Sequence, residues 1–327
     1  MGKRISGLSV TFLAVFIALA SPAKAPAQTT GLKKARVAIP NTAIGPIPTF
    51  VAKELGYYRD EGFDTEIILM RAGVTIQAVI SGSVDYTGTP GATVAAAVQG
   101  AKLLILMAYF DKPLYDLVVR PEISSYADLK GKRFGVGSLS GLSFEIPRTM
   151  VSKNGLDPKR DVTMMLIGTT QDRLMALKAN AVQATVLDPP YNFIAVKEGL
   201  RKLDSSMTYF QSLFGALTTS ERKIKNEPED VRRFVRATSR GFLAYRNHRE
   251  ISIPIMQRVL KMDQPLAEQT YDYSRAAMAT DATIGEDLMR TVIETQRQSS
   301  GVTRNVASEE VFNFSFVRTA MKELAGR

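Results

Sequence analysis

Leu129-Lys-Gly-Lys-Arg-Phe-Gly-Val136 is the stretch that decides the fold of this 327-residue chain, because a second series of strands and helices begins there. Arg133–Val136 predicts a strand, and Ser138–Ser143 predicts the loop after it. Apolar residues at helical spacing then continue to about Lys153. Strand, short loop and helix in this order predict a parallel sheet with right-handed crossovers.

Similar units lie on both sides of this stretch. The strands predicted before it are Ala35–Pro40, Thr65–Met70, a short one from Val84 and Leu103–Ala108, and the second series begins after Tyr115–Val119. The strands predicted after it are Thr163–Ile167, Ala184–Leu187 and Phe214–Ser220. Four later segments lack strand alternation and predict helices: Arg232–Ala244, Ile251–Val259, Pro265–Tyr273 and Glu286–Gln296. The pattern predicts an α/β protein with two lobes and a helical C-terminal segment.

The composition excludes several classes of function. Hydrophobic residues make up 45% of the chain and charged residues 23%, which is ordinary for a folded protein. The absence of cysteine excludes disulfides, zinc–thiolate sites, iron–sulfur ligation and thiol catalysis. The single histidine argues against a His-based triad or a His-rich metal site. We therefore expect no catalytic residues, no metal and no cofactor.

The N-terminus has the pattern of a secretory signal peptide. A basic start at Met1–Arg4 precedes the uncharged run Leu8–Ala20, and Ala23–Ala25 or Ala25–Ala27 offers a cleavage site. A membrane anchor is the alternative, but the run is shorter than the roughly 20 apolar residues that span a bilayer. We expect residues 1–27 to be cleaved and the product to be soluble in the periplasm. No lipid anchor is expected, because there is no cysteine to carry it.

The net charge of +10 does not indicate a nucleic-acid partner. Three of the basic residues belong to the signal segment, and export separates the protein from nucleic acid. Four arginines recur at helical spacing later in the chain: Arg232, Arg233, Arg236 and Arg240. A solvated helix face is the simpler interpretation of them, and docking on an acidic permease loop or on anionic lipid is the alternative.

Several short motifs carry a family resemblance. In chain order they are Pro40–Ala43, Leu55–Tyr58, Glu61–Phe63, Gly82–Asp85, Thr89-Pro90, Ala95–Gly100, Asp128–Arg133, Arg173–Ala181 and Pro189-Pro190. Their order and spacing over Arg36–Glu198 resemble the substrate-binding proteins of ABC importers. Within these, the chain is most similar to the nitrate, sulfonate, taurine and thiamine-precursor binding group.

This resemblance implies a type 2 periplasmic-binding-protein fold, with two Rossmann-like lobes, two crossover segments and a ligand cleft between the lobes. Lobe 1 would be discontinuous and comprise residues 33–119 and 216–327, and lobe 2 would comprise residues 120–215. The expected partners are a small-molecule ligand and an ABC permease in the inner membrane, and the protein is expected to be a monomer. Cleft closure on the ligand would present a surface to the permease.

The loops after the strands supply the candidate ligand-binding residues. In open parallel sheets, ligands lie outside the carboxyl ends of the strands, where helix N-termini direct free N–H groups outward. The candidates in lobe 1 are Asn41, Thr42, Arg71, Gly73, Thr89 and Pro90, and those in lobe 2 are Ser138, Ser140, Gly141, Ser143 and Asp188. Helix capping is an equal alternative for Ser140 and Ser143.

Arg71 is the most informative of these candidates. It directly follows an apolar strand and offers a bidentate clamp for a carboxylate, sulfonate or phosphate. The alternative is a solvated arginine or an ion pair with Glu66 or Asp85. Asp188 is suited to bind an ammonium or hydroxyl group, although an Asp before proline also forms turns.

Two other classes of function stay open beside the importer receptor. Thiamine-pyrimidine precursor synthases share the fold, but they consume a histidine and rely on cysteines, whereas here the only histidine, His248, lies in a charged helical segment. A secreted sensor that docks on a signalling receptor would use the same cleft.

Overall fold

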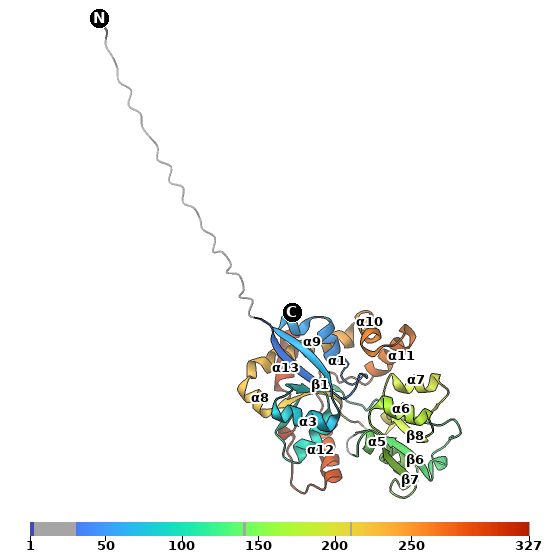
Figure 1. Ribbon diagram of the computed structural model, residues 1–327. Helices are drawn as coiled ribbons and strands as arrows, with labels where there is room; N and C mark the ends of the chain where they lie inside the picture. The colour runs from blue at the N-terminus through green and yellow to red at the C-terminus, as the bar shows by residue number, and fades with distance from the viewer. Residues whose placement is uncertain (3–30, 140–141, 210, 327) are drawn as a thin grey trace. The chain divides into compact units, whose positions relative to one another are not determined.

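The computed structural model describes residues 1–2, 31–139, 142–209 and 211–326, and Leu32–Arg327 forms one compact unit (Figure 1). The predicted signal peptide lies almost wholly outside the described residues. Among the helices that are described, none is long and apolar enough to cross a membrane. Two five-stranded sheets organise the compact unit, and we call each sheet with its flanking helices a lobe.

The sheet of lobe 1 has the strand order β2-β1-β3-β10-β4. Its strands are β1 (Lys33–Ile39), β2 (Phe63–Leu69), β3 (Tyr86–Thr87), β4 (Leu103–Phe110) and β10 (Phe214–Ser220). Strand β1 pairs in parallel with β2 and β3, whereas β10 is antiparallel to β3 and β4. Strand β10 is fully buried, and so is β4 apart from the half-buried Leu104, as their apolar runs predict.

The sheet of lobe 2 has the strand order β7-β6-β8-β5-β9. Its strands are β5 (Asp116–Val119), β6 (Lys132–Val136), β7 (Val162–Leu166), β8 (Ala184–Leu187) and β9 (Arg201–Ser205). Strand β6 is parallel to β7 and β8, and β5 is antiparallel to β8 and β9. The prediction of a purely parallel sheet is therefore wrong for both lobes. Strands β5 and β10 enter their sheets from the other lobe, at the end where the parallel strands finish, so they must run the opposite way.

The first predicted lobe boundary, after residue 119, differs from the strand pairing by one strand, and the second, after residue 215, falls within β10. Strand β5 lies within residues 33–119 but belongs to the sheet of lobe 2, and β10 starts at Phe214. The crossovers are therefore 111–115 and 206–213. They lie side by side, because Ser206 N donates to Tyr115 O at 2.8 Å and Ser212 N donates to Asp111 O at 3.1 Å. The sequence pattern also missed β9, a half-exposed strand without an apolar run.

Helices cover both sheets. Those between the strands are α1 (Ile47–Glu54), α2 (Tyr57–Asp60), α3 (Ala72–Ser81), α4 (Pro90–Val98), α5 (Leu142–Lys153), α6 (Thr170–Lys178) and α7 (Tyr191–Lys197). The C-terminal ones are α8 (Glu221–Asn226), α9 (Pro228–Asn247), α10 (Arg249–Leu260), α11 (Gln264–Arg275), α12 (Glu286–Ser300) and α13 (Ser315–Ala325). Helix α9 packs on α1, α2 and α13, so the C-terminal third completes the core of lobe 1.

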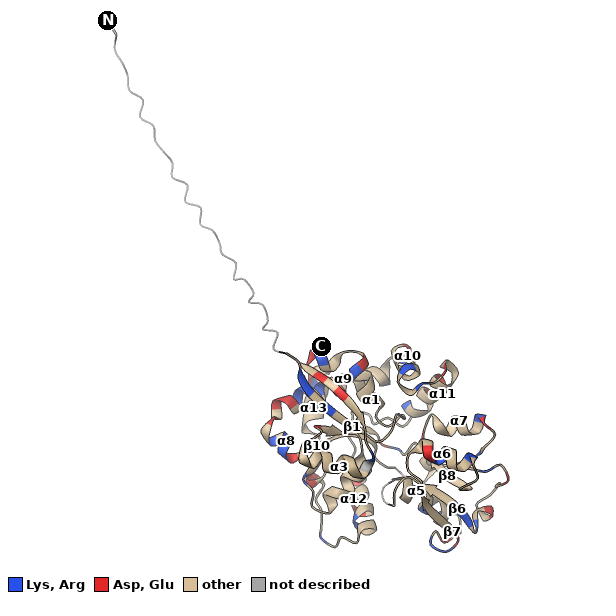
Figure 2. Cartoon of the chain, in the orientation of Figure 1, with Lys and Arg blue, Asp and Glu red and all other residues tan. Residues whose placement is uncertain are grey.

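Four of the arginines of α9, those that recur at helical spacing between residues 232 and 240, hold that packing together. Arg236 bonds Glu61 at 2.5 Å and Glu323 of α13 at 3.1 Å, and Arg232 also bonds Glu323 at 3.1 Å. Arg240 pairs with Asp60 at 2.8 Å, and Arg233 pairs with Asp230 at 2.6 Å. Basic and acidic residues accordingly alternate around α9 and α13 (Figure 2). These charges are neutralised within the molecule, which disfavours their interpretation as a docking patch.

Candidate functional site

The candidate site begins where the parallel strands of lobe 1 end. The register places Ile39 of β1 beside Leu69 of β2, and Ala38 beside Thr87 of β3. Met70 N donates to Ile39 O, and Gly88 N donates to Ala38 O, both at 2.9 Å. The loops that carry Asn41, Arg71 and Thr89 therefore leave the sheet at one edge, as the sequence predicts.

Lobe 2 repeats this arrangement. Val136 of β6 lies beside Leu166 of β7, and Gly135 lies beside Thr185 of β8. The loops after these three strands begin helices α5, α6 and α7. Ser138, Ser143 and Asp188 therefore share one edge of this sheet, whereas the predicted Ser140 and Gly141 lie outside the described residues.

The two sets of loops meet each other. Ile44 N, in the loop after β1, donates to Pro189 O, in the loop after β8, at 3.2 Å. Burial raises the pKa of the Tyr191 phenol, in the first turn of α7, and the nearby hydroxyl of Thr42 offsets part of that rise. Farther along, Ser299 Oγ donates to Glu145 Oε1 at 2.8 Å. The carboxyl ends of the two sheets therefore face one another across an interlobe site.

Arg173 connects all three loops of lobe 2. The Arg173 side chain is buried. Its Nε donates at 3.2 Å to the carbonyl oxygen of Val186, which lies in β8 just before the loop that follows this strand. Nη1 donates to Gly168 O at 2.8 Å, in the loop after β7. A Cβ placed on Gly137, in the loop after β6, would lie 2.5 Å from Nη1, so only glycine fits there. The guanidinium thus fixes the loops from beneath.

Asp188 belongs to the same buried group. Arg173 Nη2 donates to Thr170 Oγ1 at 3.1 Å, and Thr170 Oγ1 donates to Asp188 Oδ1 at 2.5 Å. Burial raises the pKa of Asp188, while Thr170 and Arg173 act to lower it. With 2% of its surface exposed, Asp188 supports the loop after β8, and contact between its carboxylate and a ligand stays a prediction.

Sequence reasoning treated Arg173 only as part of a family motif. The sequence feature that points to Arg173 is its position in the first turn of a helix that follows a strand. The capping box formed by Thr169 and Asp172 directly precedes it. From the sequence alone, an arginine at this helix position is interpreted as a surface residue, because its burial depends on three loops that are distant in sequence.

Arg71 is exposed, and no carboxylate of the described residues lies within ion-pair distance of it. The two proposed partners are engaged elsewhere: Glu66 pairs with Arg36 at 3.5 Å, and Asp85 pairs with Lys223 at 2.8 Å. Arg71 is also the N-cap residue of α3, so its cation stands at that helix's N-terminus. The ion-pair alternative is therefore not what the structure shows.

The remaining candidates of lobe 1 divide into buried and accessible positions. Thr89 is buried, and its hydroxyl bonds that of Thr87 at 2.8 Å, while Pro90 opens α4. Gly73, in the first turn of α3, is exposed, and a Cβ there would meet no atom within 4 Å. Asn41 and Thr42 are half-buried.

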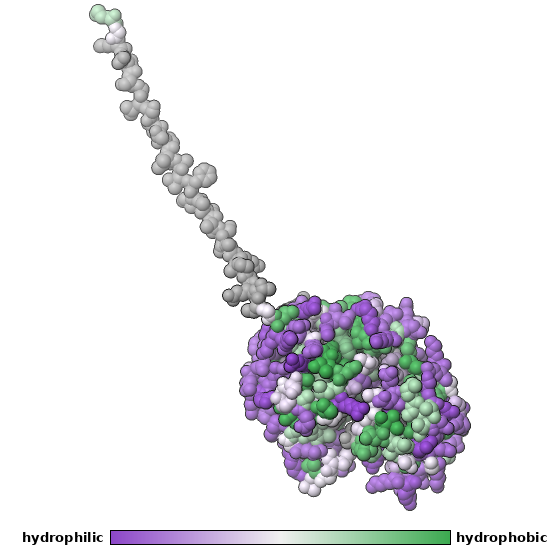
Figure 3. Space-filling view, in the orientation of Figure 1, coloured by the Kyte–Doolittle hydropathy of each residue, from purple (hydrophilic) through white to green (hydrophobic). Residues whose placement is uncertain are grey.

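Apolar side chains are exposed around the same loops. Leu69 and Val74 in lobe 1 are 61% and 58% exposed, and Leu139 and Leu166 in lobe 2 are 62% and 60% exposed. Figure 3 shows apolar surface on both lobes. The ends of the parallel strands therefore combine one unpaired cation with apolar surface.

Two mixed sheets with facing carboxyl ends, two adjacent crossovers and C-terminal helices define the periplasmic-binding-protein fold. The family model described as NMT1/THI5 like matches residues 44–251, which is more than half of the chain. The chain belongs to this NMT1/THI5-like family, as its motifs predict.

Solved structures with low identity share the fold. The periplasmic aliphatic sulphonate binding protein SsuA of Escherichia coli is 18% identical with a TM-score of 0.68, and the match covers 85% of this chain and 96% of that one. The periplasmic nitrate-binding protein NrtA of Synechocystis PCC 6803 is 12% identical with a TM-score of 0.72, covering 90% of both chains. The desulfurization enzyme DSZB is 15% identical with a TM-score of 0.65, covering 89% and 99%. The search of curated proteins gave no significant match.

Proposed function

We propose that this protein is a periplasmic solute receptor that binds a small anionic or polar-headed organic molecule between its lobes and delivers it to an ABC permease. The observation that carries the proposal is the meeting of the two loop sets, which are joined at Ile44 and Pro189. Arg71, at the start of α3 in one of these loops, has no ion-pair partner among the described residues. The binding proteins for sulphonate and nitrate among the structural neighbours support a ligand-binding role.

The proposed mechanism is cleft closure about the paired crossovers. A ligand that touches both lobes favours the closed state by the difference between its affinities for the two states. The proposed lobe-1 contacts are Asn41, Thr42, Arg71 and Gly73, and those of lobe 2 are Ser138 and Ser143. Release into the periplasm after cleavage of residues 1–27, and a monomeric state, are parts of the same proposal.

The enzyme alternative has one structural argument, the likeness to DSZB. The chain contains no cysteine. His248 is exposed and lies 3.3 Å from Glu250, at the junction of α9 and α10 and far in the chain from either loop set. We therefore favour binding without chemistry. A sensor that docks on a signalling receptor would differ only in its partner.

A thermal-shift screen tests the proposal. The protein without residues 1–27 would be heated with sulfonates, nitrate, taurine, carboxylates, aromatic acids and pyrimidines. A true ligand at about 100 times its Kd adds about 2.7 kcal/mol to the free energy of unfolding. A screen in which no compound raises the Tm would remove the proposal's support.

The role of Arg71 is tested separately with any anionic ligand from that screen. Arg71→Ala should weaken binding at least tenfold. Arg36→Ala is the matched control, because Arg36 is an exposed arginine on the neighbouring strand, paired with Glu66. Equal Kd values for Arg71→Ala and the unaltered protein would exclude Arg71 from the site.

A further inference from the structure

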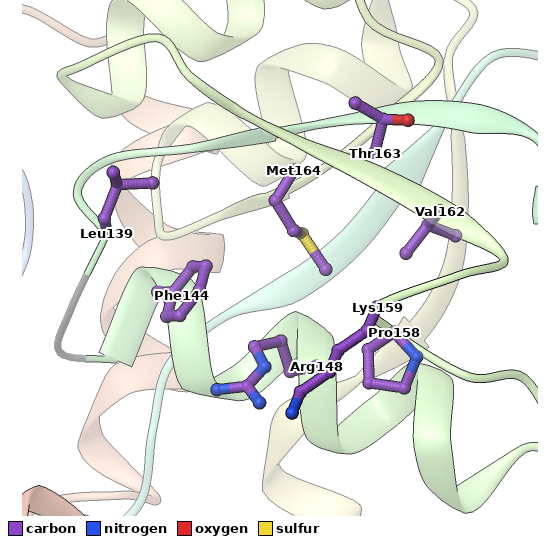
Figure 4. Close-up of a pocket in the computed structure, with 8 residues that line it drawn as sticks. All are labelled: Leu139, Phe144, Arg148, Pro158, Lys159, Val162, Thr163 and Met164. Carbon is purple, nitrogen blue, oxygen red and sulfur yellow. The ribbon is translucent and has the colours of Figure 1, made fainter. Parts of the chain in front are cut away.

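A hollow of about 520 Å³ lies on lobe 2 between α5 and the edge strand β7 (Figure 4). Eight residues line it: Leu139, Phe144, Arg148, Pro158, Lys159, Val162, Thr163 and Met164. It is distinct from the interlobe site, because its lining extends from Leu139 at the end of β6 to Pro158 and Lys159, which precede β7 at the opposite end of the sheet. Its volume is in the range of small-molecule sites.

Two cations line this hollow and no acidic residue does. Lys159 is exposed, and no carboxylate of the described residues lies within ion-pair distance of its Nζ. Arg148 has one weak partner, Glu145, at 3.4 Å, and Glu145 also accepts a bond from Ser299. Figure 4 shows the Arg148 and Lys159 side chains reaching toward the same side of the hollow. The hollow is therefore electropositive.

Apart from Thr163, the rest of the lining is apolar. The Arg148 guanidinium lies 5.1 Å from the centre of the Phe144 ring, which leaves a flat apolar surface next to the charge. Met164 lies across from the cations in Figure 4, and its flexible thioether suits contact with ring systems. Leu139 is 62% exposed beside them.

A second hollow, of about 440 Å³, serves as a comparison because both acidic and basic residues line it. Its lining mixes three carboxylates with two arginines: Glu286, Glu294, Glu309, Arg290 and Arg297. Most of these are paired, as Arg297 is with Glu294 at 2.5 Å. The hollow on lobe 2 differs in that no carboxylate lines it and one of its two cations, Lys159, has no ion-pair partner among the described residues.

We propose that the hollow between α5 and β7 is a second binding site, which takes a small organic anion with an aromatic or branched apolar body. The anionic group contacts Arg148 and Lys159, and the apolar body lies on Phe144, Met164 and Leu139. Since Phe144 lies in the first turn of α5, the site adjoins the loop after β6 but is separate from the interlobe cleft.

The probe for this site is 8-anilinonaphthalene-1-sulfonate, whose fluorescence reports apolar binding. Arg148→Gln and Lys159→Gln should each weaken its binding at least fivefold, and the double variant more. Arg160→Gln is the matched control, because Arg160 lies next in sequence but is 80% exposed and pairs with Asp157. N-phenyl-1-naphthylamine, the same ring system without the sulfonate, should bind weakly and equally to all variants.

Methyl spectra of ¹³C-labelled methionine locate the probe. Met164 should shift on titration, while the exposed Met175 on the same lobe should not. Equal shifts at both methionines would show non-specific adsorption and overturn the site. Unchanged affinity in Arg148→Gln and Lys159→Gln, or loss of affinity in Arg71→Ala, would also overturn it and place the probe in the interlobe cleft.

Competition identifies the occupant. Displacement of the probe by 1-naphthoate supports a small organic anion. Displacement by an acidic peptide and not by 1-naphthoate would assign the hollow to a protein partner and overturn the proposal. Weaker binding in Arg71→Ala assigns a compound from the thermal-shift screen to the interlobe site, and weaker binding in Arg148→Gln or Lys159→Gln assigns it to the hollow, so either the second site or the receptor function can fail alone.

Discussion

Replacing Arg173 by methionine should destabilise the protein strongly, even though Arg173 touches no ligand in the proposed mechanism. The substitution keeps a long side chain but removes three donors, those to Val186 O, Gly168 O and Thr170 Oγ1. It also removes the positive charge that acts to lower the pKa of buried Asp188.

The expected cost follows from burial. A hydrogen bond from a charged donor contributes roughly 1.5–3 kcal/mol, and three such bonds in one side chain are not additive. Removing one partner of a buried ionic group costs about 3–5 kcal/mol, because the other charge stays buried without compensation. We expect Arg173→Met to lower the free energy of unfolding by about 3–5 kcal/mol.

Urea denaturation followed by circular dichroism measures this loss. The matched control is Arg160→Met, which breaks an exposed pair with Asp157 in the same lobe and should cost about 0–1 kcal/mol. In a double-mutant cycle, Arg173→Met should cost less when Asp188→Asn is already present, since the buried charge is then absent. Equal costs for the two arginine variants would refute the role given to Arg173.

Three further predictions concern packing, the crossover and pH. Gly241→Ala should lower the free energy of unfolding by about 1–3 kcal/mol, because its Cβ would lie 2.5 Å from Pro48 O and 2.6 Å from Ala52 Cβ. Gly326→Ala is the control, since the nearest atom to a Cβ at that position is 3.8 Å away. A Gly241→Ala variant more stable than the unaltered protein would contradict this packing. Tyr273→Phe should lower the free energy of unfolding by about 1.5–3 kcal/mol, because the Tyr273 hydroxyl donates to the buried carboxylate of Asp116 at 2.8 Å. Urea denaturation measures this loss, and Tyr57→Phe, the control, should lower the free energy of unfolding by less. Burial raises the folded-state pKa of Asp188 above its ordinary value of 3.8, so its effect on stability is most favourable below pH 3.8 and is lost as the pH rises through the raised pKa. The stability of the unaltered protein relative to Asp188→Asn should therefore fall as the pH rises above 3.8, and a constant difference would show that the pKa of Asp188 is not raised.

The crossover shows how a fold prediction can be correct in kind and wrong in detail. The predicted first lobe ends at Val119, but Asp116–Val119 forms β5, which pairs with β8 and β9 in lobe 2. Apolar runs identify buried strands without identifying the strand that pairs with them. The polar β9 was missed for the same reason, since only its pairing with β5 makes it a strand.

The sequence by itself determined the alternation of strands and helices, the restart at Leu129, the lack of thiol chemistry and the loops in which a site would form. These follow from local periodicity and composition, which each segment carries alone. Tertiary structure decided which charges are free. Arg236 pairs with Glu61 and Glu323, Arg173 is buried beneath three loops, and Arg71 has no ion-pair partner in the part of the chain that the structure describes. Charge pairing depends on residues that are distant in the chain, so only the folded molecule separates a structural arginine from one available to a ligand.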